Sequence, residues 1–126
     1  MSYGYPPSQL CLLADLPQKQ VDDKVRFLGC VKSYSLSTGT LTLEHRISGD
    51  TRPVEALVDV NCVRASLGTD QTRFGEWVNV VGYITQTSGQ KASSSAKQMV
   101  EVQATLVWSA GPLNLQTYEL SVRALL

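Results

Sequence analysis

The chain has 126 residues, enough for one domain spanning 1–126, with 43% hydrophobic residues and a balance of 11 Lys+Arg against 11 Asp+Glu. That apolar content supports a folded core and excludes a disordered chain. Zero net charge argues against a strong autonomous nucleic-acid binder, because phosphate neutralisation needs clustered cations. No apolar run is long enough for a membrane helix, and the N-terminus lacks the basic start of a signal peptide, so we expect an intracellular protein.

The first two strand signals form a hairpin. Residues 24–34 carry the first one, with Gly29 in its middle. A glycine weakens a strand unless it serves a bend or bulge, so we expect a long strand bent at Gly29 that belongs to both sheets of a small barrel. Residues 40–45 alternate apolar and polar side chains, and the loop 37–39 joins the two segments.

The next two signals are a third strand and a short helix. Residues 54–60 place alternate apolar side chains on one face. Residues 61–67 then read as one or two helical turns, which Asn61 can cap and Gly68 can end.

The last two strand signals are residues 76–87 and 99–109. In the latter, alternation predicts that the even-numbered residues up to Leu106 and Trp108 point inward. Five strands with a helix between the third and the fourth are the order of the Greek-key barrel that binds oligonucleotides and oligosaccharides, the OB-fold. We therefore predict an all-β OB-fold; a β-sandwich, the alternative, needs seven strands.

The segments outside the strands have their own patterns. Residues 86–98 form a polar loop, placed where such barrels carry a ligand-gripping loop, and a tolerated surface loop is the alternative. The apolar segment 10–16 is expected to pack on one barrel mouth, after a disordered stretch 1–9.

A helical period of 3.6 begins after Pro112 and predicts a C-terminal helix over 113–126 with Asn114 as N-cap. One side of this helix is apolar and the opposite side carries Leu120 and Ala124. The pattern indicates that one side docks on the barrel and the other meets a partner, without deciding which. The residues we expect at the partner interface are Leu115, Tyr118, Glu119, Val122, Arg123 and Leu126.

Catalytic chemistry has little support in the sequence. His45 is the only histidine and reads as an ordinary polar residue at a strand end, so no nucleophile has a base partner. The three cysteines, Cys11, Cys30 and Cys62, are odd in number and far apart, which predicts reduced thiols rather than a zinc site or disulfides. We expect no enzyme, no metal and no cofactor.

Nucleic-acid binding would need aromatic side chains beside cations. Trp77 and Tyr83 share one face of their strand, although packing against the barrel is the more ordinary role of such a tryptophan. The candidates we select come from the first strand and the loops: Lys32, Tyr34, Arg46, Lys91 and Lys97.

Several of these segments together resemble a known family. The segments are 25–31, 41–45, 56–60, 75–83 and 107–113, the last reading Val-Trp-Ser-Ala-Gly-Pro-Leu. They are similar to fungal Ten1, the smallest subunit of the CST telomere-capping complex, over roughly Ser8 to the end.

The resemblance implies one barrel that pairs with the N-terminal OB domain of the Stn1 subunit through C-terminal helices, and through it with the large CST subunit. It also implies a nuclear protein at chromosome ends that helps protect single-stranded telomeric DNA and supports fill-in synthesis. Two alternatives stay open: a small subunit of replication protein A, and a stand-alone single-strand binder. The sequence indicates neither a DNA sequence preference nor the stoichiometry.

Overall fold

The computed structural model describes residues 7–46, 53–87 and 97–125. Five strands close into a barrel in the order β2-β3-β4-β6-β5, with β5 returning to β2, and β1 adds to the outer edge of β2. All pairs in the barrel are antiparallel except β4 with β6. The strands are β1 (Gln9–Leu10), β2 (Lys24–Ser35), β3 (Thr40–Glu44), β4 (Val54–Asp59), β5 (Trp77–Thr87) and β6 (Gln98–Ser109), and the helices are η1 (Leu13–Gln18), η2 (Asn61–Ser66), α1 (Thr69–Thr72) and α2 (Leu115–Ala124), where η marks a 3-10 helix.

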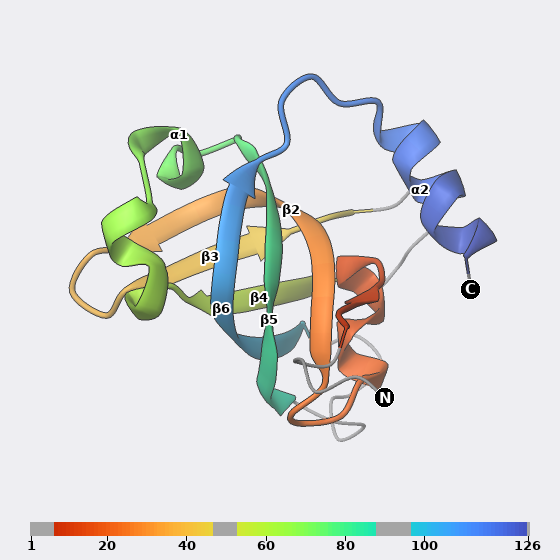
Figure 1. Cartoon of the computed structure of the whole chain (residues 1–126), viewed down its shortest axis with the longest axis horizontal. Helices are drawn as coiled ribbons and strands as arrows, with labels where there is room; N and C mark the ends of the chain where they lie inside the picture. Colours follow the sequence, from red (N-terminus) through yellow and green to blue (C-terminus); the bar gives the residue numbers. More distant parts are fainter. Residues whose placement is uncertain (1–6, 47–52, 88–96, 126) are drawn as a thin grey trace.

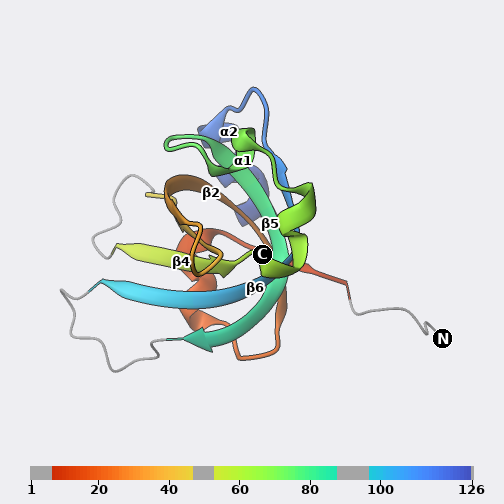
Figure 2. The same cartoon turned by 90° about the vertical axis from the view of Figure 1, so that its left-hand side faces the viewer.

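The barrel closes because β2 is shared between two neighbours. Its first half pairs with β5 and its second half with β3, and Cys30 takes part in both pairings. Gly29 lies inside the strand directly before this change of partner, as the sequence predicted. A Cβ at Gly29 would stand 2.8 Å from Cβ of Leu43, closer than carbon atoms can approach. Figure 1 shows the strong curvature of β2, and Figure 2, turned by 90°, shows the strands enclosing the core.

The N-terminal segment plugs one barrel mouth, as expected. Cys11, Leu13 and Leu16 are buried within the same apolar cluster as the barrel strands. The preceding Gln9 already pairs with Val25 of β2, so this residue of the stretch expected to be disordered lies in a strand. Residues 1–6 lie outside the described residues.

A bulge in β6 corrects the predicted alternation. Gly82 pairs with Ala104 but Val81 pairs with Leu106, which leaves Thr105 as an extra residue. Its hydroxyl donates to the carbonyl of Val81 over 3.1 Å. Beyond the bulge the phase reverses, so Leu106 is exposed and Val107 packs against the core instead.

The short helix between the third and fourth predicted strands is present as the 3-10 helix η2, but its predicted caps are wrong. The Asn61 amide donates to Asp59 Oδ1 (2.8 Å) and to the carbonyl of Thr38 (3.1 Å), and caps no turn. Gly68 precedes the single turn α1 rather than ending η2. In Figure 1, η2 and α1 lie at one end of the barrel and α2 at the other.

The helix α2 begins as predicted. The side chain of Asn114 accepts a hydrogen bond of 3.0 Å from the backbone N–H of Thr117, which satisfies one of the free donors of the first turn. Within the described residues, no helix is long and apolar enough to cross a membrane.

Candidate partner and nucleic-acid surfaces

The side of α2 that carries Val122 rests on the outside of the chain's own barrel. Leu28 points outward from β2 by alternation and is nevertheless buried, as are Leu12 and Val122, which is 1% exposed. None of these three belongs to the core cluster inside the barrel. They therefore mark a second, smaller apolar layer, between the barrel wall and α2.

A buried polar contact fixes α2 to the end of β3. Nε2 of His45 lies 2.8 Å from Oε2 of Glu119, and the His45 side chain is fully buried. Its ring meets Trp77 edge to face at 5.2 Å and lies 6.3 Å from the ring of Tyr118. His45 is thus a structural anchor rather than the ordinary polar residue expected. A sequence pattern could not reveal this, because Glu119 lies 74 residues away.

Nδ1 of His45 is buried without a hydrogen-bond partner among the described residues. The hydroxyl of Tyr118 is also buried, and it lies close to the backbone of Leu28. Burial raises the pKa of the Tyr118 hydroxyl, which therefore stays a neutral phenol. A buried polar atom without a partner costs about 1–3 kcal/mol, so Nδ1 of His45 offsets part of the stability that burial of its ring contributes.

The six residues expected to meet a partner are divided between two environments. Val122 and Glu119 are engaged within the chain, and a partner could reach Val122 only if α2 left this seat. Leu115 and Tyr118 are half-buried, Arg123 is exposed, and Leu126 lies outside the described residues. The opposite side of the helix presents Leu120, which is 64% exposed, and the helix end presents Leu125, which is 71% exposed.

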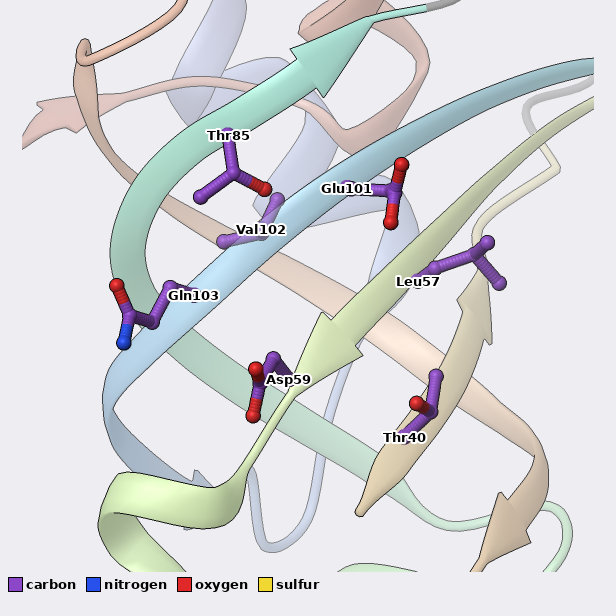
Figure 3. A pocket seen from close by; sticks show the side chains of 7 residues that line it. All are labelled: Thr40, Leu57, Asp59, Thr85, Glu101, Val102 and Gln103. Atoms are coloured by element: carbon purple, nitrogen blue, oxygen red, sulfur yellow. The ribbon is translucent and has the colours of Figure 1, made fainter. Parts of the chain in front are cut away.

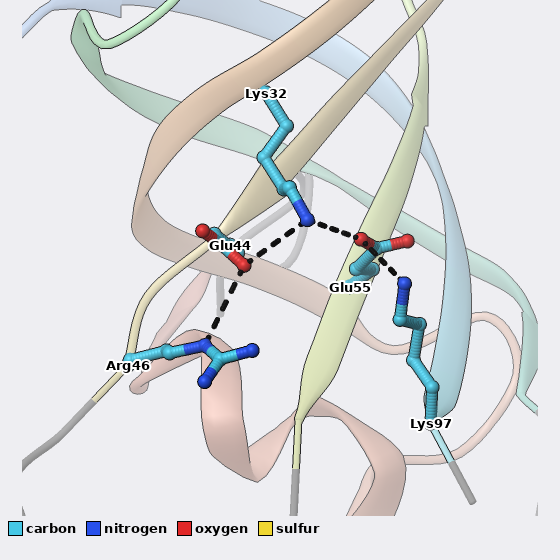
Figure 4. Close-up of polar contacts among 5 residues, drawn as sticks. All are labelled: Lys32, Glu44, Arg46, Glu55 and Lys97. Atoms are coloured by element: carbon cyan, nitrogen blue, oxygen red, sulfur yellow. Dashed lines mark hydrogen bonds and ion pairs between the residues drawn. The ribbon is translucent and has the colours of Figure 1, made fainter.

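The candidate nucleic-acid cations are brought together, but with carboxylates between them. Nζ of Lys32 lies 3.0 Å from Glu55 and 3.5 Å from Glu44. Lys97 lies 3.1 Å from the same Glu55 oxygen, and Arg46 lies 3.8 Å from Glu44. Figure 4 shows this chain of contacts on the outer face of β3 and β4. Lys91 lies outside the described residues.

Tyr34 does not join these cations. Val31 pairs with Leu43 and Ser33 with Thr42, so Lys32 is an extra residue in β2 and the strand changes phase there. Tyr34 consequently packs against the core opposite Leu41. The bulge thus turns Tyr34 away from Lys32 and toward a hollow that it lines together with Arg64 and Leu67, and a role of Tyr34 in DNA binding stays a prediction.

A hollow of about 390 Å³ continues the same outer face toward β6. Asp59 of β4 and Glu101 of β6 line it, together with the polar groups of Thr40, Thr85 and Gln103 (Figure 3). In the part of the chain that the structure describes, neither carboxylate has an ion pair. The hollow is therefore an acidic extension of the face.

The opposite wall carries the pairs of aromatic and cationic side chains that the sequence analysis did not select. The guanidinium of Arg26 lies 5.4 Å from the ring centroid of Trp108. Nζ of Lys24 lies 5.9 Å from the ring centroid of Tyr83. Both pairs join β2 to a strand that is distant in sequence, so only the strand register brings them together.

The geometry defines a class of protein before any comparison: a five-stranded OB-fold barrel with an added C-terminal helix. Among the described residues, the outward side of β3 and β4 carries no aromatic side chain. Solved structures agree with this class. Replication protein A of U. maydis, solved bound to ssDNA, superposes with a TM-score of 0.57 at 20% identity, covering 96% of this chain and 91% of that one. At that identity the likeness concerns the fold.

The family itself is shown by a family model for Ten1, telomere capping, CST complex subunit, which matches residues 1–123. The chain therefore belongs to the Ten1 family of telomere-capping CST subunits. A crystal structure of the S. pombe Stn1–Ten1 complex contains a chain 28% identical, with a TM-score of 0.69 and coverage of 98% of this chain and 95% of that one. Ten1 from Saccharomyces pombe gives a TM-score of 0.66 at 28% identity, with coverage of 94% and 96%. No curated protein sequence matches the chain.

Proposed function

We propose that this telomere-capping subunit pairs with the N-terminal barrel of a Stn1-type subunit, and through that subunit with the large CST subunit. The observation that carries the proposal is the match to a Ten1 chain solved in a Stn1–Ten1 complex over nearly the full length of both chains. The chain would then act by binding, without catalysis, at chromosome ends in the nucleus.

Helix α2 is the proposed centre of the pairing. It adds an apolar element beyond the closed barrel and leaves Leu120 and Leu125 exposed. A stable interface buries about 1,600 Å² in total around a few apolar anchors. With Val122 facing inward, the side available to a partner is the one that carries Leu120, bordered by Arg123 and by the half-buried edges of Leu115 and Tyr118.

The test of the pairing is co-expression of the full chain with the Stn1-type subunit of the same organism. Light scattering on the purified material is expected to give the mass of a heterodimer. Mixing the separately purified chains should give the same species. Two proteins that elute as separate monomers at micromolar concentrations would remove the proposed pairing.

The proposed DNA contact is weak in the isolated chain and stronger in the heterodimer. Its basis is the zero net charge and the neutralisation of Lys32, Arg46 and Lys97 by neighbouring carboxylates. Replacing these three and Lys91 by Ala in the heterodimer should flatten the dependence of single-stranded DNA affinity on salt. An unchanged slope would place the DNA contact elsewhere.

A further inference from the structure

Glu55 holds two of the candidate DNA-binding lysines on one oxygen atom. Its Oε2 lies 3.0 Å from Nζ of Lys32 and 3.1 Å from Nζ of Lys97. The Glu55 side chain is 9% exposed, whereas Lys32 and Lys97 are 35% and 47% exposed. The carboxylate therefore lies beneath the two ammonium groups, and the ammonium groups face solvent.

This carboxylate remains charged at neutral pH. Burial by itself would raise the pKa of Glu55, but the hydrogen bonds and charges of Lys32 and Lys97 outweigh it and hold the pKa below its usual value. The hydrogen bond that Lys32 donates to Glu55 is the largest cause of a raised pKa at Lys32, and the charges of Glu44 and Glu55 add to it. Each lysine therefore already has an anionic partner.

The rest of the face offers phosphate no other attraction among the described residues. Arg46 is paired with Glu44, and the adjoining hollow presents Asp59 and Glu101. Three cations on the β3–β4–β6 face (Lys32, Arg46, Lys97) stand against four carboxylates (Glu44, Glu55, Asp59, Glu101), a sum of −1. A DNA phosphate gains a lysine here only by taking it from a carboxylate.

We propose that Glu55 sets the affinity of this face for single-stranded DNA, because it competes with phosphate for Lys32 and Lys97. The inference rests on the proposed DNA contact. Binding is an exchange in which phosphate oxygens replace Oε2 of Glu55 as acceptors for the two ammonium groups. Glu55 therefore lowers the affinity of this face for any nucleic-acid backbone, whatever its sequence, and leaves affinity to be supplied by the partner subunit.

The chain offers a matched control for the test. Glu76 is also a glutamate in an ion pair, at 3.5 Å from Arg73, and it lies directly before β5. Among the described residues it has no ion pair with Lys32 or Lys97. E55Q and E76Q remove the same charge from the whole protein. A difference between them in DNA binding therefore measures the local release of Lys32 and Lys97, and not the change of net charge.

The measurement is fluorescence anisotropy of a labelled oligo-dT of about 18 nucleotides, long enough for one or two OB-folds, titrated with the full chain in its heterodimer at several salt concentrations. E55Q is expected to bind the oligonucleotide about fivefold more tightly at low salt. The slope of the logarithm of the binding constant against the logarithm of the salt concentration should be steeper by about 0.7 for each lysine released. E76Q is expected to change affinity by less than about twofold. The triple variant E55Q/K32Q/K97Q should lose the whole gain.

Equal affinities of E55Q and E76Q would overturn the inference, as would a triple variant that binds as tightly as E55Q. If the heterodimer does not form, the proposed pairing fails. If it forms and binds DNA but E55Q has no effect, only the role of Glu55 fails. Melting curves check that E55Q folds. If it does not, the fallback variant is E44Q, which frees Arg46 and removes one of the two carboxylates near Lys32. E44Q should then show a smaller gain in DNA affinity than expected for E55Q, and an unchanged affinity would overturn the inference.

Discussion

Replacing Val122 by Ala separates the two sides of α2. The structure buries Val122 at 1% exposure against the barrel wall. Deleting two methyl carbons from such a site costs about 0.8 kcal/mol each in transfer free energy, and incomplete closure of the gap brings the total to about 2 kcal/mol. In a domain of this size that corresponds to a fall in melting temperature of about 7 °C. Affinity for the Stn1-type partner should be unchanged for the folded molecules.

The matched variant is Leu120→Ala on the opposite side of the same helix. Leu120 is 64% exposed, so its loss should change the stability of the isolated chain by less than about 0.5 kcal/mol. It should weaken the heterodimer by about 1 kcal/mol or more, which is roughly fivefold in affinity.

The assays are thermal melting of the isolated chain and isothermal titration with the partner. Hydrogen exchange of the α2 amides would show whether Val122→Ala releases the helix locally while the barrel stays folded. The reasoning is refuted if Val122→Ala weakens partner binding and leaves both melting and exchange unchanged, because the buried stripe would then face the partner.

Three further predictions follow from single positions. Gly29→Ala should lower the free energy of unfolding by about 1–3 kcal/mol in denaturant titrations, since its Cβ has no space; wild-type stability would contradict the close packing. Burial raises the pKa of the Cys11 thiol to about 11, so Ellman's reagent at pH 8 should modify exposed Cys62 quickly and Cys11 only after unfolding. Folding lowers the pKa of Glu55, so its ionised form stabilises the protein at pH values above the unfolded pKa of about 4.3. The free energy of unfolding of the wild type should therefore exceed that of Glu55→Gln by less than about 1 kcal/mol at neutral pH, and this difference should vanish as the pH falls toward 3. A difference that grows on acidification would contradict the lowered pKa.

Alternation of apolar residues was enough to predict the barrel strands, because each strand has one face in the core. It failed past the bulge in β6, at Leu106, where an extra residue reverses the phase. It also gave no sign of the bulge at Lys32, which turns Tyr34 toward the core. A bulge depends on the register with the neighbouring strand, which the order of residues along one strand does not contain. Gly29 lies within the long strand β2 as predicted, because a glycine inside a strong strand pattern is a local signal.

The surfaces were less predictable than the fold. The sequence identified the cations Lys32, Arg46 and Lys97. Arg46 pairs with Glu44, which lies only two residues before it. Glu55, the partner of Lys32 and Lys97, comes from another strand, so the neutralisation of the two lysines could not be seen. For the same reason the helical pattern showed two apolar sides of α2 but not that Glu119 turns one of them toward His45. Long-range contacts decide which charges and which faces remain available.

The contact between His45 and Glu119 makes the position of α2 depend on a finished barrel. His45 follows directly after β3, whose strand must pair with both β2 and β4 before the imidazole reaches its buried position. A chain with an unfinished barrel therefore has no seat for α2 and cannot present the outer side of that helix in its proper orientation. A partner that recognises the docked helix would consequently select completed subunits and leave misfolded ones unassembled.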